Sequence, residues 1–332
     1  MTILLSGAAG FIGYHVARSL LSRGERVVGI DDCNAYYDVR LKEARLAQLS
    51  EFPCFAFHRL DITDRDAMLA LFAGEAEASH VVHLAAQAGV RHALVDPYSY
   101  VASNLAGHLV ILEAARRLPR LRHLLYASSS SVYGANTSLP FSESDRVDQP
   151  VSLYAATKRG AELISASYAH QFALPQTGLR FFTVYGPWGR PDMAYYGFAR
   201  AIVEGRPITL FDDGRLRRDF TYIDDIVAGV LGCLDRPPDA SPPHRLLNIG
   251  NHRSEEVRTL VSILEQSLGR KAVVQNTPRP ATEVRETFAS IEAIAALTGF
   301  SPTTPLSLGI PRFIAWFRAF HGLNEGPGRP DC

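Results

Sequence analysis

The sequence predicts an α/β protein in which a doubly wound parallel sheet is combined with a smaller α/β domain. Short runs rich in β-branched residues alternate with amphipathic stretches through the first half of the chain. These runs are apolar throughout, which is typical of parallel strands that are buried on both faces. A glycine-rich segment links the first run to the first amphipathic stretch. Together these features indicate strands joined by helices that cover both faces of one sheet.

The predicted elements can be placed in order along the chain. The strands are TILLSG, RVVGID, FAFHRLD, HVVHLA, HLLYASS and QTGLRFF, at residues 2–7, 26–31, 55–61, 80–85, 123–129 and 176–182. The helices between them are predicted at residues 11–22, 64–73, 104–117 and 154–171. A helix at 221–234 and a strand RLLNIG at 245–250 return to the same pattern.

The pattern changes after about residue 180, where proline and glycine accumulate in segments such as YGPWGRPD and NTPRPATE. We therefore predict a larger domain that spans residues 1–180 with returns near 221–250. A smaller domain is predicted to span residues 181–220 and 251–325. Residues 235–244, DRPPDASPPH, are predicted to form an exposed loop between elements.

The composition argues against several classes of partner. The chain has 332 residues, 47% of them hydrophobic, which is enough for a sizeable core. Because 34 lysines and arginines balance 34 acidic residues, no excess of positive charge indicates nucleic acid or an anionic membrane. The N-terminal segment lacks the basic region and cleavage site of a secretory signal, and no apolar stretch is long enough to span a bilayer.

The cysteines support the same interpretation of the compartment. They are widely scattered and form neither a CxxC pair nor the even spacing of a disulfide framework: Cys33, Cys54, Cys233 and Cys332. A reducing compartment is the simplest interpretation. We expect a cytoplasmic protein with no nucleic-acid and no membrane partner.

The glycine-rich segment ILLSGAAGFIG predicts a phosphate-binding turn. Gly7, Gly10 and Gly13 lie between the first strand and the first helix, where a tight turn lets backbone N–H groups approach a pyrophosphate. The second strand ends in Asp31, whose carboxylate can accept hydrogen bonds from ribose hydroxyls. Because that carboxylate would repel a 2′-phosphate, the pattern favours NAD over NADP. Asp61 and Ile62 follow the third strand and could contact adenine, although they could equally belong to a helix N-cap region.

A second motif, YAATK, places Tyr154 and Lys158 at i and i+4, on one face of a helix. A tyrosine with an ordinary pKa of ~10 needs a drop of roughly three units, about 4 kcal/mol, to act as a base near neutrality. An ammonium ~4 Å away at an effective dielectric of ~20 supplies about that much. Upstream, LLYASSSSVYG holds the four serines 128–131, which could form either a solvated loop or a polar binding surface.

In this combination of motifs the chain resembles the extended short-chain dehydrogenase/reductase superfamily. The resemblance implies a Ser, Tyr and Lys catalytic set, and it places Ser129 with Tyr154 and Lys158. It also implies a Rossmann-type NAD-binding domain and a smaller nucleotide-sugar-binding domain. The cofactor contacts that it implies are Gly7, Gly10, Phe11, Ile12, Gly13, Asp31, Asp32, Asn34, Asp61, Ile62, Leu84, Ala85, Ala86, Gln87, Asn104, Tyr154 and Lys158.

Five segments resemble the UDP-glucuronate 4-epimerases in particular. They are GIDDCNAYYDVRLKEARL, HLAAQAGVRHAL, YASSSSVYGANTSLPFSE, PVSLYAATKRGAEL and LRFFTVYGPWGRPDMA. The resemblance implies interconversion of UDP-glucuronate and UDP-galacturonate through a transient 4-keto sugar, with tightly bound NAD. The substrate contacts that it implies are Arg91, Ser129, Ser130, Ser131, Tyr154, Thr183, Arg190, Arg218 and Arg279. A homodimer built on helices near residues 100–117 and 154–171 is expected by analogy.

Several alternatives remain open from the residues alone. Arg91 and Arg190 could be surface ion-pair partners, and Arg218 could belong to a solvated basic loop. The segment RPATEV replaces the Pro-Gly-Asp-Val turn of the family by Thr282 and Glu283, which weakens the assignment of Arg279. The protein could also be another UDP-sugar 4-epimerase, a decarboxylase of the superfamily, or a non-catalytic sensor of NAD or nucleotide sugar.

Other candidate residues have simpler structural interpretations. The histidines form no metal-binding motif, so His83 is predicted to be a core residue, and no metal site is predicted. Asp224 and Asp225 open a predicted helix, where capping is favoured over acid catalysis.

Overall fold

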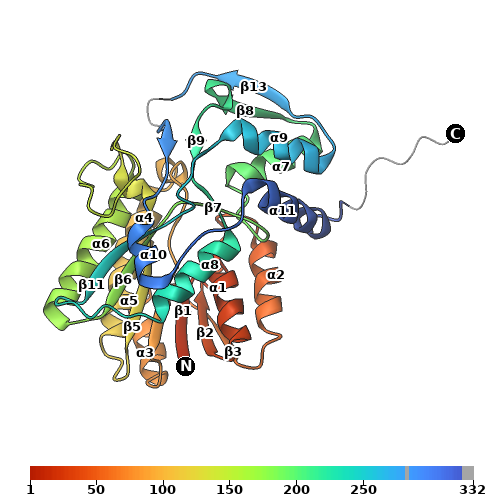
Figure 1. The fold of residues 1–332 in the computed structure, drawn as a ribbon. Coiled ribbons are helices and arrows are strands. Elements are labelled where there is room, and N and C mark those ends of the chain that lie inside the picture. Colours follow the sequence, from red (N-terminus) through yellow and green to blue (C-terminus); the bar gives the residue numbers. More distant parts are fainter. Residues whose placement is uncertain (281–283, 324–332) are drawn as a thin grey trace.

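The computed structural model describes residues 1–280 and 284–323. Its centre is a parallel sheet of seven strands in the order β11-β6-β5-β4-β1-β2-β3 (Figure 1). The strands are β1 Thr2–Ser6, β2 Arg26–Asp31, β3 Phe55–Arg59, β4 His80–His83, β5 His123–Ser129, β6 Gln176–Phe181 and β11 His244–Ile249. The chain builds outward from β1 in one direction and then from β4 in the other. The predicted doubly wound sheet is confirmed, and its switch point between β1 and β4 is where such sheets bind ligands.

Two groups of helices cover the two faces of this sheet. Helices α1 (Phe11–Ser22), α2 (Val39–Leu49) and α8 (Ile223–Leu234) pack against one another on one face. Helices α3 (Arg65–Gly74), α5 (His108–Ala115) and α6 (Leu153–Phe172) do so on the other. The alternation of side chains along a strand produces this arrangement, since Ile3 and Leu5 belong to one buried cluster and Leu4 to the other.

Local sequence signals explain where several helices begin. Asp38, Asp64 and Ser152 each accept a backbone N–H of the first turn, at the start of α2, α3 and α6 respectively. The helix predicted at 104–117 begins earlier than expected. It consists of α4 (Pro97–Val101), a π-helical segment η2 (Ala102–Gly107) and α5, which follow one another directly.

The remaining elements form the smaller part of the molecule, which lies above the sheet in Figure 1. Strand β8 (Pro207–Phe211) pairs with β13 (Val273–Thr277), and β9 (Arg217–Arg218) pairs with both β12 (Glu255–Glu256) and β14 (Glu286–Thr287). Strands β7 (Thr183–Tyr185) and β10 (Phe220–Tyr222) form a parallel pair where the chain leaves the sheet. The helices of this part are α7 (Ala194–Glu204), α9 (Val257–Leu268) and α11 (Leu306–Phe320), whereas α10 (Glu292–Thr298) lies beside the sheet (Figure 1). Short 3₁₀ turns complete the fold: η1 His92–Leu94, η3 Ser130–Tyr133 and η4 Asp212–Gly214.

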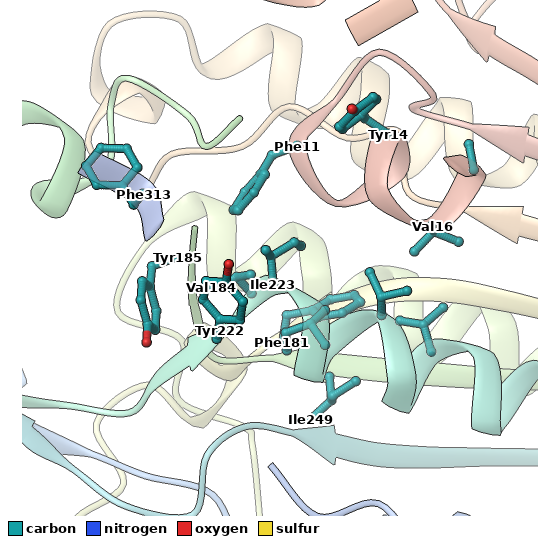
Figure 2. Close-up of a cluster of buried hydrophobic side chains, with 14 of the residues drawn as sticks. Phe11, Tyr14, Val16, Phe181, Val184, Tyr185, Tyr222, Ile223, Ile249 and Phe313 are labelled. Atoms are coloured by element: carbon teal, nitrogen blue, oxygen red, sulfur yellow. The ribbon is translucent and has the colours of Figure 1, made fainter. Parts of the chain in front are cut away.

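One continuous apolar cluster joins the two parts of the molecule. Figure 2 shows Phe11 of α1, Phe181 of β6 and Phe313 of α11 within this cluster, and all three side chains are buried. Because the two parts share a core, the cleft between them has fixed walls. Helix α10 packs against α8 and β11, although the predicted boundaries place it with the smaller domain. The division of the chain into domains stays a prediction.

Some predictions fall outside the described residues, including those on Thr282, Glu283 and Cys332. Within residues 1–280 and 284–323, no helix combines the length and the hydropathy that crossing a bilayer requires.

Candidate active site

The glycine-rich turn between β1 and α1 has no room for side chains. A Cβ atom on Gly13 would lie 1.9 Å from the Gly7 carbonyl oxygen, and one on Gly7 would lie 2.6 Å from the backbone nitrogen of Ala85. Gly7 also has a φ of 79°, in the left-handed region that glycine adopts most readily. Gly10, the N-cap of α1, provides no side-chain cap, so no side chain of the N-cap pairs with the first N–H groups of the helix. This turn has the form of a phosphate site.

Asp31 lies at the end of β2, directly beside this turn. Its buried carboxylate accepts hydrogen bonds from the backbone N–H groups of Ala9 (3.1 Å) and Cys33 (2.8 Å). Burial raises the pKa of Asp31, while the charge of Lys42 lowers it. Each carboxylate oxygen keeps a second acceptor position, which fits hydrogen bonding to ribose hydroxyls.

The neighbouring acidic residues form local turns at the rim of the cleft. Asp32 accepts hydrogen bonds from the backbone and side-chain nitrogens of Asn34, and Lys42 donates to Asn34 Oδ1 at 3.0 Å. Asp61 is exposed and accepts from the Thr63 N–H, whereas the N-cap of α3 is Asp64. Asp32, Asn34, Lys42 and Asp61 of these turns line the cavity together with Asp31.

The residues that follow β4 form another wall of the cleft. Gln87 is held by Asn104, whose Oδ1 accepts the Gln87 N–H at 2.8 Å and whose Nδ2 donates to the Gln87 carbonyl at 3.0 Å. Asn104 also donates to Thr157 of α6 at 3.1 Å. It is buried in the π-helical segment η2 and does not line the cavity. The structure therefore places Asn104 behind the cofactor wall, and its predicted cofactor contact stays a prediction.

The predicted catalytic residues come together where β5 ends. Ser129 is the last residue of β5, and Tyr154 and Lys158 lie one turn apart on α6. The Ser129 hydroxyl is near enough to the Tyr154 phenol to lower its pKa, and Lys158 Nζ donates to the Ala127 carbonyl at 2.9 Å. All three residues line the same cavity as the glycine-rich turn.

The pKa values at this site differ from the expectation for Tyr154. Burial raises the pKa of the phenol, while the hydrogen bond from Ser129 and the charge of Arg190 lower it, and the net direction is upward. Burial lowers the pKa of Lys158 to about 8, against the opposing charge of Glu162. The ammonium is directed at the Ala127 carbonyl, so in this geometry its charge is not among the groups that lower the pKa of the phenol.

One cavity of about 820 Å³ connects these groups to the smaller part of the molecule. Its volume is in the range of small-molecule sites. The cavity includes nearly all of the predicted contacts, namely Gly7, Gly10, Phe11, Ile12, Gly13, Asp31, Asp32, Asn34, Asp61, Ile62, Leu84, Ala85, Ala86, Gln87, Arg91, Ser129, Ser130, Ser131, Tyr154, Lys158, Thr183, Arg190 and Arg218. Asn104 and Arg279 are the predicted contacts that do not line it.

Three of the four predicted arginines, Arg91, Arg190 and Arg218, line this cavity. The guanidinium of Arg91 lies over the ring of Phe211 in β8, 5.8 Å from the ring centroid. Arg190 forms two hydrogen bonds with Asp192, at 3.0 and 2.6 Å. Arg279 lies at the surface, with its backbone N–H bonded to Asp212 and its Nε 3.8 Å from the same carboxylate.

Two side chains that the sequence did not single out complete this wall. Tyr36, from the segment after β2, donates a hydrogen bond of 3.1 Å to Asp192. Asp192 therefore connects Arg190, in the segment before α7, to Tyr36 at the rim of the cleft. Only the WGRPD spacing, with an acid two residues after Arg190, could have indicated this pair from the sequence.

Arg45 of α2 is a further residue that the sequence did not indicate. It is fully buried and donates to the Ala9 carbonyl at 2.7 Å, the Tyr37 hydroxyl at 2.7 Å and the Gly189 carbonyl at 3.3 Å, and it also donates to the Trp188 carbonyl. A single guanidinium thus ties the glycine-rich turn to the segment that carries Arg190. The shape of the cleft depends on this tie.

An Arg45→Met substitution is expected to destabilise the fold by about 2–4 kcal/mol, because it leaves several buried acceptors without donors. We also expect weaker retention of NAD, since the Ala9 carbonyl belongs to the glycine-rich turn. Urea unfolding and the NAD content of the purified protein measure the two effects. Arg40→Met, on the same helix but exposed, should change neither, and an Arg45→Met protein with the wild-type urea midpoint would contradict the structural role.

The residues with simpler interpretations behave as structural groups. His83 is buried, is hydrogen-bonded to Ser6 Oγ at 2.7 Å, and has a pKa held well below its usual value by burial. Asp225 accepts hydrogen bonds from the backbone N–H groups of Thr303 and Thr304, so it fixes the segment before α11 and does not cap its own helix. Among the described residues, no group of three or more His, Cys, Asp or Glu side chains could hold a metal ion.

A model of the NAD dependent epimerase/dehydratase family matches residues 3–250 of the chain. The chain belongs to this family. This confirms the predicted NAD dependence and the predicted resemblance to extended short-chain dehydrogenases/reductases.

Similar proteins include several UDP-glucuronate 4-epimerases. A probable UDP-glucuronate 4-epimerase of Rhizobium meliloti is 44% identical over 96% of this chain and 97% of its own length. UDP-glucuronate 4-epimerase 1 of Arabidopsis thaliana is 46% identical over 98% of this chain and 78% of its own length. The crystal structure of UDP-glucuronic acid 4-epimerase from Bacillus cereus with UDP-glucuronic acid and NAD is 34% identical, with a TM-score of 0.89 over 96% of this chain and all of that one.

Proposed function

We propose that the protein is a UDP-glucuronate 4-epimerase, which interconverts UDP-glucuronate and UDP-galacturonate. The observation that carries this proposal is the single cavity that joins the glycine-rich turn and Asp31 to Ser129, Tyr154 and Lys158. The similarity of the whole chain to enzymes of that activity supports it. The fit of the turn and of Asp31 to a dinucleotide supports NAD as the tightly bound cofactor.

The proposed reaction oxidises the sugar at carbon 4 and reduces it again on the other face. NAD, when bound, takes the hydride from carbon 4 and gives it back. Tyr154 takes the proton of the hydroxyl group on carbon 4, directly or through Ser129, and returns it after the 4-keto ring has turned over. Lys158 is proposed to hold the ribose and, once its ammonium turns from the Ala127 carbonyl toward the phenol, to favour the phenolate by its positive charge.

The glucuronate carboxylate adds a chemical hazard to this reaction. The 4-keto sugar is a β-keto acid, and such an acid loses carbon dioxide readily if its carboxylate is free to turn. We propose that Ser129, Ser130, Ser131 and Thr183 hold the carboxylate with neutral hydroxyl donors. No acidic residue lies in the segment LLYASSSS, which favours epimerisation over decarboxylation. Arg91, Arg190 and Arg218 are proposed to contact the diphosphate, and the same role for Arg279 stays a prediction.

The proposal is tested by incubating the purified protein with UDP-glucuronate and resolving the products by chromatography and mass. UDP-galacturonate, of the same mass as the substrate, is the expected product. UDP-pentoses would identify a decarboxylase, and turnover of UDP-glucose alone would identify another UDP-sugar epimerase. No product from protein with intact NAD would favour the alternative of a non-catalytic sensor.

We further propose that the enzyme is a homodimer. The described surface exposes large apolar side chains on η1, α4 and α6, including Leu94 (89% exposed), Tyr98 (83%) and Leu163 (55%). Helices α4, α5 and α6 pack together, so these side chains belong to one helical region. A second copy of the chain would remove them from water, as expected from the family resemblance.

Tyr98→Glu is expected to weaken this dimer about 30-fold or more, the effect of losing about 2 kcal/mol at an interface hot spot. Sedimentation velocity over a range of protein concentrations measures the shift. Val273→Glu, an exposed change on β13 of the other part, should leave association as it is in the wild type. A wild-type protein that sediments as a monomer at all concentrations would rule the dimer out.

A further inference from the structure

A buried ion pair lies behind the serines that face the cavity. Arg180 of β6 donates to both oxygens of Glu162 of α6, from Nε at 2.8 Å and from Nη2 at 3.0 Å. Their side chains are 1% and 0% exposed. Burial raises the pKa of Glu162, but Arg180 outweighs this, so the pKa is lowered and the carboxylate stays charged. Because removing two charges from water is expensive, such a pair is weak evidence for stability and points to a role in specificity.

The hydrogen bonds of this Glu162–Arg180 pair reach both ends of the serine segment, which we define as Ser129–Ser131. On one side, Ser128 Oγ donates to Glu162 Oε1 at 2.6 Å. On the other side, Arg180 Nη1 donates to the Tyr133 hydroxyl at 3.1 Å, and its guanidinium lies 5.0 Å from the centre of the Tyr133 ring. The residues that flank the segment are therefore held by one rigid ion pair.

The same network fixes Tyr133 from its other side. The Tyr133 hydroxyl donates to Asn248 Oδ1 of β11 at 2.6 Å, and its ring stacks on Phe141 with centroids 4.5 Å apart. Asn248 in turn donates to the Phe141 carbonyl at 2.9 Å. Three neighbouring strands, β5, β6 and β11, are thus connected where β5 ends and η3 begins. The connection consists of the Glu162–Arg180 pair, Tyr133 and Asn248.

The pair is also linked to the proposed base through one helix. Glu162 lies one helical turn after Lys158 and two turns after Tyr154 on α6. The helix that carries the base therefore also anchors the segment that is proposed to hold the sugar carboxylate. Because α6 carries both residues, it fixes the distance between the proposed base, Tyr154, and the ion pair that holds the serine segment.

We propose that the Glu162–Arg180 pair positions the serine segment so that the 4-keto intermediate keeps its carboxylate. This inference rests on the proposed epimerase function and deepens it. Loss of carbon dioxide breaks the bond between sugar carbons 5 and 6, and its electron pair enters the carbon 4 carbonyl to give an enolate. Carbon 5 then takes a proton from water, and carbon 4 regains the hydride held by the cofactor and the proton held by Tyr154 to give a UDP-pentose. The bond breaks fast only when it lies parallel to the carbonyl π orbital, so a carboxylate held with this bond close to the plane of the carbonyl suppresses the step.

Small displacements are enough to matter here, because a shift of about 1 Å can change a reaction rate about a hundredfold. Ser128→Ala removes the hydrogen bond between Glu162 and the residue that precedes the serine segment, and it leaves the hydroxyls of Ser129, Ser130 and Ser131 in place. Ser165→Ala is the matched control, since Ser165 lies on α6, is equally buried and loses one hydrogen bond of 2.8 Å, to His108. The two variants should melt at similarly reduced temperatures.

The experiment measures the ratio of UDP-pentose to UDP-galacturonate made from UDP-glucuronate by the wild type and both variants, together with released carbon dioxide. We expect Ser128→Ala to raise this ratio about tenfold over the wild type, and Ser165→Ala to leave it unchanged. Glu162→Gln should raise it further if the protein folds. Equal ratios in Ser128→Ala and Ser165→Ala would overturn the inference, whereas a wild type that makes no UDP-galacturonate would overturn the proposed function itself.

Discussion

Tyr154→Phe is expected to lower kcat for the conversion of UDP-glucuronate about 10³-fold, because it removes the only phenol that meets both Ser129 and the cavity in the described site. The substitution keeps the ring and its packing against Tyr100, with centroids 6.2 Å apart. NAD content and substrate affinity should therefore stay close to those of the wild type. Turnover under saturating substrate, with NAD content measured on the same preparation, checks this result.

The matched control for this substitution is Tyr126→Phe. Tyr126 lies on β5, is buried, and loses one hydrogen bond of 2.9 Å to His244, away from the cavity. It should lose some stability and little turnover. If Tyr154→Phe has the kcat of the wild type, the phenol takes no part in the reaction. If the wild type shows no turnover and Tyr154→Phe binds its ligands as the wild type does, the result supports the sensor alternative.

The sheet could be predicted because most of its strands are short and mainly apolar runs. Helix α2 was not predicted, and its buried face explains why. Two of its buried residues are the cations Lys42 and Arg45, so the apolar periodicity of the helix is interrupted. Both cations are there to hold neighbouring loops, a function that no periodicity reveals. The helix predicted at 104–117 begins earlier, at Pro97, and this start was missed for a similar reason, since the π-helical turn at 102–107 does not follow the 3.6-residue period.

The residues that line the candidate site could be predicted from the sequence, but the residues that hold them in place could not. Ser129, Tyr154 and Lys158 have a spacing that is set by one helix and one strand end, and the glycines have a spacing that is set by one turn. Arg45, Asp192 and Glu162 act through partners that are distant in sequence, such as Tyr36 for Asp192. Their importance depends on which segments the fold brings together. Sequence spacing contains no such information without the structure.

The pKa of Tyr154 depends on burial of the phenol as well as on nearby charges. The attraction of an ammonium is large enough to create a phenolate, but burial of the phenol acts in the opposite direction. In the structure Lys158 is itself desolvated, and its ammonium is bonded to a backbone carbonyl. The effect of Lys158 on the phenol therefore depends both on the charge of its amine and on the group at which that amine is directed.

Lys158 leads to the second large effect, which is a dependence on pH. Burial lowers the pKa of Lys158 from the usual 10.5 to about 8. The ammonium is therefore present below about pH 8 and is lost as the pH rises through that value. Because the neutral amine no longer favours the phenolate, kcat/KM of the wild type should fall on the alkaline side of about pH 8. Lys158→Met should lower kcat about 10²–10³-fold at every pH, since it never carries the charge.

Lys158→Arg keeps the positive charge of the side chain but removes its titration near pH 8. A guanidinium keeps its charge at any pH at which the protein is folded, so this variant should be slower than the wild type and yet show no alkaline decline. Lys271→Met, an exposed change, should keep both the wild-type rate and the wild-type pH profile. An alkaline limb that persists unchanged in Lys158→Arg would assign the titration to another group. In that case Lys158 would act only by holding the Ala127 carbonyl and the ribose in place.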